Sequence, residues 1–187
     1  MSKPRIPAIS GKADIAPEHH GLVDDVIGVF GQVRGPFSML LHSPGLAALA
    51  LPLVPFVREK SIVPDTLRMA SVLAAVRERE SHYVWSAQAG YARRVGIREE
   101  LIDLLRAKGD SSGLPEDERD VVDFARQLMR TNRVEPALFD RLNIKFGPQW
   151  MVEMTASLNF YVFLCGITNS FDVPPQVGGD LLPPEVG

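Results

Sequence analysis

Residues 77–96 read RERESHYVWSAQAGYARRVG, a charged run followed by a segment with helical spacing. Ser81 is a suitable N-cap, because a serine hydroxyl can accept a hydrogen bond from the free amides of a first helical turn. Gly96 suits the position just after a helix end. His82 and its aromatic neighbours are therefore expected in the first turn, beside the positive end of the helix dipole. Such a helix start can bind a small anionic molecule. The alternative is that its aromatic side chains fill the core.

The chain on both sides of this stretch has the spacing of further helices. They are predicted at about 18–32, 37–42, 44–57, from 64 into 77–81, at 97–108, from 115, at 135–146 and at 148–170. Pro52 and Pro55 predict a kink or a break near Leu51, because proline removes a backbone donor. No segment alternates with a period of two, so the fold class is all-α, a single-domain helical bundle. Its predicted organisation is an extended arm (1–16), one helical domain (17–171) and a Pro/Gly-rich tail (172–187).

Composition narrows the function classes. A net charge of −3 and the absence of a basic run argue against a nucleic-acid partner. The single cysteine, Cys165, excludes an intrachain disulfide and a thiolate metal cluster. The stretch 151–167 is apolar, but Glu153 and Asn159 interrupt it, which favours a buried helix over a membrane span. The start of the chain has no apolar signal region, so a cytoplasmic location is expected.

Glu78, Glu80 and His82 form the group best suited to acid–base chemistry. Histidine titrates near neutral pH, and a carboxylate can orient it. Glu78 and His82 are four residues apart and would share a face of one continuous helix. The same residues also fit a solvated charge run at a helix end. No pair of histidines or cysteines has metal-ligand spacing, so neither a metal nor another cofactor is expected.

Other chemistry-bearing side chains each have a structural alternative. Tyr83 and Trp85 could line a pocket for a flat ligand, or fill the core. His42 could be a pocket group or a packing group. Cys165 lies in an apolar helix with no neighbouring acid, which indicates a buried inert thiol.

The segments 35–44 (GPFSMLLHSP) and 68–96 together resemble the carboxymuconolactone decarboxylase superfamily, which also contains the alkylhydroperoxidase D-type proteins. The Leu-Leu-His-Ser-Pro start, the Tyr-x-Trp pair and the later Ala-x3-Gly follow the order of that family. Residues 158–169 resemble its closing helix. The resemblance covers about residues 20–175. It implies an all-helical fold assembled as trimers or hexamers, with pockets shared between subunits.

The sequence departs from both branches of the superfamily at the catalytic positions. The peroxidase branch has a Glu, a Cys-x2-Cys pair and a His, which align with Met69, Ser81, Val84 and Gln88 here. None of these side chains can carry a thiol relay, so a thiol peroxidase is not expected. The cysteine-free branch has Tyr-Glu-Trp and then a His, where this chain has Val84 and Gln88.

The resemblance, combined with the remaining residues, predicts a cofactor-independent lyase that acts on a small carboxylated or oxygenated ring compound. Arg77 or Arg34 would hold a carboxylate, with His42 as a further binding group. His82, helped by Glu78, would deliver a proton, and Tyr83 is a third catalytic candidate. Trp85 and Gln88 would shape the pocket. The alternatives are an isomerase, cyclase or hydrolase of a specialised pathway, a non-catalytic ligand-binding protein and, least supported, a redox protein.

Overall fold

The computed structural model describes residues 3–183, and these contain helices and no strand, which confirms the all-α fold class. The ends of the predicted arm and tail, residues 1–2 and 184–187, lie outside the described residues. The α-helices are α1 (His20–Phe30), α2 (Pro36–Leu40), α3 (Pro44–Ala50), α4 (Leu53–Pro55), α5 (Asp65–Glu78), α6 (His82–Arg94), α7 (Glu99–Arg106), α8 (Glu116–Thr131), α9 (Pro136–Phe146) and α10 (Pro148–Ser170). Short 3₁₀ turns precede α1 at Lys12–Asp14 and Pro17–His19, and a π-helical turn, η3 (Phe56–Lys60), follows α4.

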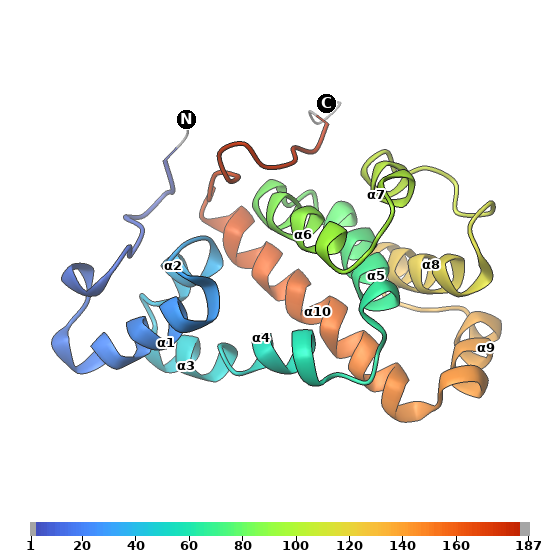
Figure 1. Cartoon of the computed structure of the whole chain (residues 1–187), viewed down its shortest axis with the longest axis horizontal. Coiled ribbons are helices and arrows are strands. Elements are labelled where there is room, and N and C mark those ends of the chain that lie inside the picture. The colour runs from blue at the N-terminus through green and yellow to red at the C-terminus, as the bar shows by residue number, and fades with distance from the viewer. Residues whose placement is uncertain (1–2, 184–187) are drawn as a thin grey trace.

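Helix α10 is the axis of the molecule (Figure 1). It packs against α2, α5, α6 and α9, and α5 packs in turn against α8. In the view of Figure 1, α1 to α4 lie on one side of α10 and α5 to α8 on the other. Residues from both groups and from α10 form one hydrophobic core.

Helix α10 is long and apolar enough to cross a membrane by length and composition. Half of the residues in its most apolar stretch are buried inside the protein, and Met154 and Leu158 are fully buried there. It is therefore a core helix of this fold.

The third predicted helix is broken at the predicted place. Helix α3 ends at Ala50, and the chain continues through α4 into the π-helical turn η3, which is closed by the amide of Ser61 donating to the carbonyl of Phe56 at 3.0 Å. Pro52 and Pro55 lack the amide hydrogens that a continuous helix would use here. The break turns the chain so that η3 faces α6 and α10.

The charged run ends one helix and begins the next. Helix α5 ends at Glu78, Glu80 adopts a left-handed conformation (φ 48°), and α6 begins at His82. Glu78 and His82 thus lie on separate helices, so the shared helix face considered from the sequence does not exist. Ser81 is the N-cap residue as predicted, but its hydroxyl makes no capping bond and instead hydrogen-bonds Thr168 on α10 at 3.0 Å.

Both terminal segments pack along the helices. The Arg5 side chain pairs with Asp172, and the Pro7 carbonyl accepts a hydrogen bond from His42 at 2.8 Å. Beyond α10 the tail turns back over α6, where Leu182 is buried. The N-terminal arm is therefore tied to the start of the C-terminal tail through Arg5 and Asp172.

Candidate functional site

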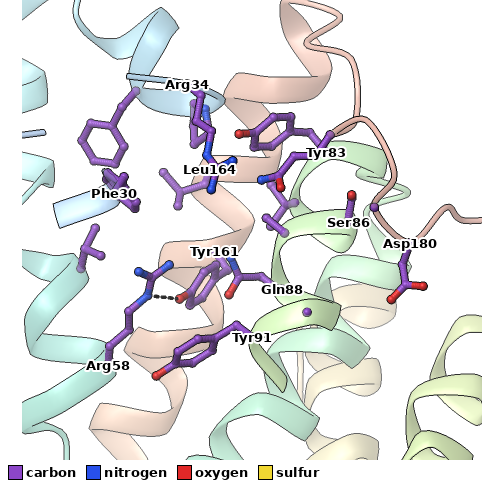
Figure 2. A pocket seen from close by; sticks show the side chains of 18 of the residues that line it. Phe30, Arg34, Arg58, Tyr83, Ser86, Gln88, Tyr91, Tyr161, Leu164 and Asp180 are labelled. Atoms are coloured by element: carbon purple, nitrogen blue, oxygen red, sulfur yellow. Dashed lines mark hydrogen bonds between the residues drawn. The ribbon is translucent and has the colours of Figure 1, made fainter. Parts of the chain in front are cut away.

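A pocket of about 530 Å³ lies where α1, α2 and η3 face α6 across α10. The tail residues Gln176–Asp180 form part of its wall. Its size is that of a site for a small organic molecule. Figure 2 shows its side chains: Arg34 and Tyr83 lie on one side, Arg58, Tyr91 and Tyr161 on the other, and Gln88 and Leu164 between them.

Tyr83 comes from the first turn of α6 and is only 8% exposed. Its ring lies on the backbone of Gly35, where a Cβ would stand 2.2 Å from Cε1. Gly35 has φ 61°, a conformation that favours glycine. Burial raises the pKa of Tyr83, while the Gln176 side chain and the Arg34 charge lower it by smaller amounts. The net effect is a phenol that keeps its proton inside the pocket.

The charges around the pocket are mainly positive. Arg34, Arg58 and Arg94 line it, and none of them forms an ion pair within residues 3–183. Arg93 is the exception, because Glu99 and Asp180 both pair with it. An overall acidic protein thus places uncompensated cations at this pocket.

Two polar groups in the pocket wall are buried and have no hydrogen-bond partner among the described residues. They are the Ser86 hydroxyl and the side-chain oxygen of Gln88, both on α6. Buried polar atoms are normally paired, so an unpaired one facing a pocket is available to a ligand or a water molecule.

The tail covers the Ser86 side of the pocket. Gly179 approaches so closely that a Cβ there would lie 1.9 Å from Ser86 Oγ. Asp180 pairs with Arg93 on α6 and, at 3.5 Å, with Arg106 on α7. Residues 176–180 are therefore fixed to α6 and α7 by both packing and charge.

The structure brings three of the eight sequence-predicted site residues into this pocket: Arg34, Tyr83 and Gln88. His82 points into a neighbouring open hollow of about 790 Å³ between the arm, the tail and the start of α6. Tyr83 lines both spaces. His82 remains a predicted acid–base group by position, but it is not among the residues of the main pocket.

Glu78 and Glu80 are engaged elsewhere in ion pairs. Both oxygens of Glu78 accept from Arg130 on α8, at 2.6 and 3.0 Å, and the two side chains of Glu78 and His82 share no hydrogen bond. Glu80 pairs with Lys108 and with Arg77. The proposed help from Glu78 to His82 therefore has no contact to support it.

The remaining predicted binding residues also lie away from the pocket. Arg77 donates to the Arg106 carbonyl at 2.6 Å, Trp85 is fully buried beneath Arg106, and His42 is held at the surface by Pro7. For Trp85 and His42 these are the packing alternatives considered from the sequence. Arg77 is half-buried next to the break between α5 and α6, where it pairs with Glu80.

Cys165 is buried beside Ser81, and burial raises its pKa to about 12. A thiol with that pKa is protonated at neutral pH, and it is not a pocket residue. Within residues 3–183, no three His, Cys, Asp or Glu side chains gather closely enough to hold a metal ion.

The sequence did not indicate Arg58, Tyr91 and Tyr161 as site residues. Arg58 Nε donates to the Tyr161 hydroxyl at 3.4 Å across 103 positions of chain, a contact that no local spacing encodes. The proline pair that breaks the third helix was the only signal near Arg58. The tail residues were missed because they follow the last helix and have no periodicity.

No model of a protein family matches the sequence, and no curated protein matches it. Solved structures do match, and they show that the chain has the fold of the alkylhydroperoxidase D core. That fold is the one implied by the sequence resemblance, which is confirmed at this level. An uncharacterized peroxidase-related protein from Ralstonia eutropha JMP134 with this core has 18% identity and a TM-score of 0.73, over 92% of each chain.

Two structures of the debrominase Bmp8 are also similar. A cysteine-to-alanine variant in complex with 2,3,4-tribromopyrrole has 15% identity and a TM-score of 0.71, over 93% of this chain and 94% of that one. The apo form has 16% identity and a TM-score of 0.68, over 90% and 91%. At these identities the likeness establishes the fold.

Proposed function

We propose that the protein is a cofactor-independent enzyme that transfers a proton to or from a small carboxylated or oxygenated ring compound. The observation that carries this proposal is Tyr83: a buried, protonated phenol at the wall of the main pocket, next to the Arg34 cation. Tyrosine can act as a general acid when it is held within reach of the reacting atom. Tyr83 takes the place that the sequence suggested for His82.

The reaction that best fits these residues is decarboxylation beside an unsaturated or carbonyl group. The bond between the ring carbon and its carboxylate breaks, CO₂ leaves, and the electron pair of that bond remains as an enolate or dienolate. Arg34 stabilises the negative charge as it develops. The Tyr83 hydroxyl then gives its proton to carbon. The phenolate left behind takes a proton from solvent, because its raised pKa makes it a strong base.

The fold neighbours support a small ring compound as the substrate. A variant of the debrominase Bmp8 is bound to 2,3,4-tribromopyrrole, so one protein with this fold binds a single flat ring. The pocket of this chain has apolar walls from Phe37, Val84 and Leu164, which suit the faces of a flat ring. Thiol chemistry is not part of the proposal, since Cys165 is buried and protonated.

The experiment is turnover of a panel that pairs each carboxylated compound with its neutral counterpart. Suitable members are carboxylated γ-lactones, hydroxybenzoates and β-keto acids of aromatic rings, followed by ultraviolet absorbance and by CO₂ release. Turnover of one member that is lost in Tyr83→Phe supports the proposal. Binding of several members without any chemical change would instead indicate a ligand-binding protein and would overturn it.

A further inference from the structure

Arg58 has an unusual local structure that fixes its direction. It lies in the π-helical turn η3. A π-helix has hydrogen bonds between residues five apart, whereas the α-helices around it have them between residues four apart. Single π turns inside helical segments are frequent at functional sites. Here the turn follows Pro52 and Pro55 and aims a half-buried arginine at the pocket.

The Arg58 guanidinium is held by aromatic groups and not by a carboxylate. Its Cζ lies 5.5 Å from the centre of the Phe30 ring and 5.2 Å from that of Tyr91, and Nε donates to the Tyr161 hydroxyl. The two terminal nitrogens have no hydrogen-bond partner within residues 3–183. An arginine oriented in this way keeps its planar pair of donors free for a ligand.

Arg68, whose guanidinium hydrogen-bonds the Arg58 carbonyl, is an arginine with a structural role and can be compared with Arg58. Its side chain is 2% exposed and is neutralised by Asp65, with further hydrogen bonds to the carbonyls of Val63 and Arg58. Among residues 3–183, Arg58 has no such neutralising partner. A partly desolvated cation without a counter-charge is costly unless an anion completes the site.

We propose that Arg58 and the Tyr161 hydroxyl form a carboxylate subsite, on the side of the pocket opposite Tyr83. This inference rests on the proposed function and makes its substrate class more specific. The substrate carries a carboxylate that does not react and is bound at Arg58, while its reacting carbon lies at Tyr83. A guanidinium fork matches the two oxygens of a carboxylate, and the ring between the two sides lies on Leu164 and Val84.

The test is calorimetric binding of 4-hydroxybenzoate and of its neutral isostere 4-hydroxybenzamide to the whole protein. We expect the wild type to bind the carboxylate about 10–100-fold more tightly than the amide, the range of a charged hydrogen-bonded contact. Arg58→Gln should remove that preference and leave amide binding within about threefold, as only the carboxylate contact is lost. Tyr161→Phe should weaken carboxylate binding several-fold.

Arg94→Gln is the matched control, because its guanidinium also lies over the Tyr91 ring, 5.3 Å from its centre, and it removes the same charge. It should keep most of the preference. Equal binding of the two probes by the wild type, or a preference that survives Arg58→Gln or disappears equally in Arg94→Gln, overturns the subsite. Circular dichroism of each variant confirms that it is folded.

Failure of the subsite is distinguishable from failure of the proposed function. Carboxylate preference that depends on Arg58, without turnover of any compound in the panel, supports the subsite and removes the enzyme proposal. Turnover that depends on Tyr83, together with a carboxylate preference that Arg58→Gln leaves unchanged, supports the enzyme proposal and removes the subsite.

Discussion

Gly35 and Tyr83 are in direct contact: a Cβ on Gly35 would lie 2.2 Å from Tyr83 Cε1 and 2.3 Å from the hydroxyl oxygen. The turn between α1 and α2 therefore sets where the phenol of α6 stands in the pocket. The Ser38 hydroxyl donates to the Gly35 carbonyl at 2.7 Å and fixes that turn. The position of the proposed proton donor, Tyr83, thus depends on Gly35, which lies 48 positions earlier in the chain.

Gly35→Ala should displace Tyr83 and lower activity. The positive φ costs about 1–3 kcal/mol for alanine, and the clash adds about 1–3 kcal/mol of overpacking. We expect a clear fall in the free energy of unfolding by urea, together with a loss of turnover. Gly28→Ala in the middle of α1 is the control, because a Cβ there meets nothing within 4 Å. A Gly35→Ala protein as stable and active as the control would contradict the contact.

Gly179→Ala should loosen the tail over Ser86. The new methyl would overlap Ser86 Oγ, at a cost of about 1 kcal/mol, because that hydroxyl can rotate. Ser86→Ala alone should be nearly neutral, since the buried hydroxyl has no partner to lose. The double variant should regain most of the lost stability. If the stability change of the double variant equals the sum of the changes of the two single variants, Gly179 and Ser86 do not touch.

The pH dependence of kcat separates the two candidate proton donors. A phenol with a pKa raised above its ordinary value of about 10 stays protonated through neutral and mildly basic pH. Tyr83 as the acid therefore predicts a level kcat from about pH 6.5 to 9, with a fall only beyond about pH 10. A falling limb near neutrality would argue against Tyr83.

The protein is expected to form a trimer or hexamer, as the sequence resemblance implies. An apolar strip along α3 and α4 supports this expectation: Leu49 is 77% exposed, and Leu46 and Leu53 are nearly half exposed. Light scattering at micromolar concentration should give a mass well above the 20.6 kDa of one chain. Leu49→Glu should shift the mass downward. A wild-type mass of one chain would contradict the expectation.

Much of the fold follows from the sequence because local prolines and glycines mark where many of its helices end. Pro52 and Pro55 break the third helix near Leu51, and Gly96 (φ 94°) follows α6 as predicted. The break between α5 and α6 was not predictable in the same way. It depends on a left-handed Glu80 and on Ser81 bonding Thr168, 87 positions away.

The site was only partly predictable, because it forms from segments distant in the chain. Tyr83 and Gln88 were found through the family register of one helix, and both face the pocket. His82 is adjacent to Tyr83 in sequence, but one step around a helix is enough to point it into the other hollow. Arg58 and Tyr161 meet only when η3 packs across α10, so no local pattern revealed them.

Tyr83 as the proton donor is tested by kcat for Tyr83→Phe and His82→Ala, measured side by side on the compound that the panel identifies. Tyr83→Phe removes only the hydroxyl and should lower kcat by about 10²–10⁴-fold, the usual contribution of a general acid. His82→Ala should stay within a few-fold of wild type, since His82 lies outside the main pocket. The opposite result, normal turnover by Tyr83→Phe and a loss of that size in folded His82→Ala, would rule out Tyr83 as the proton donor.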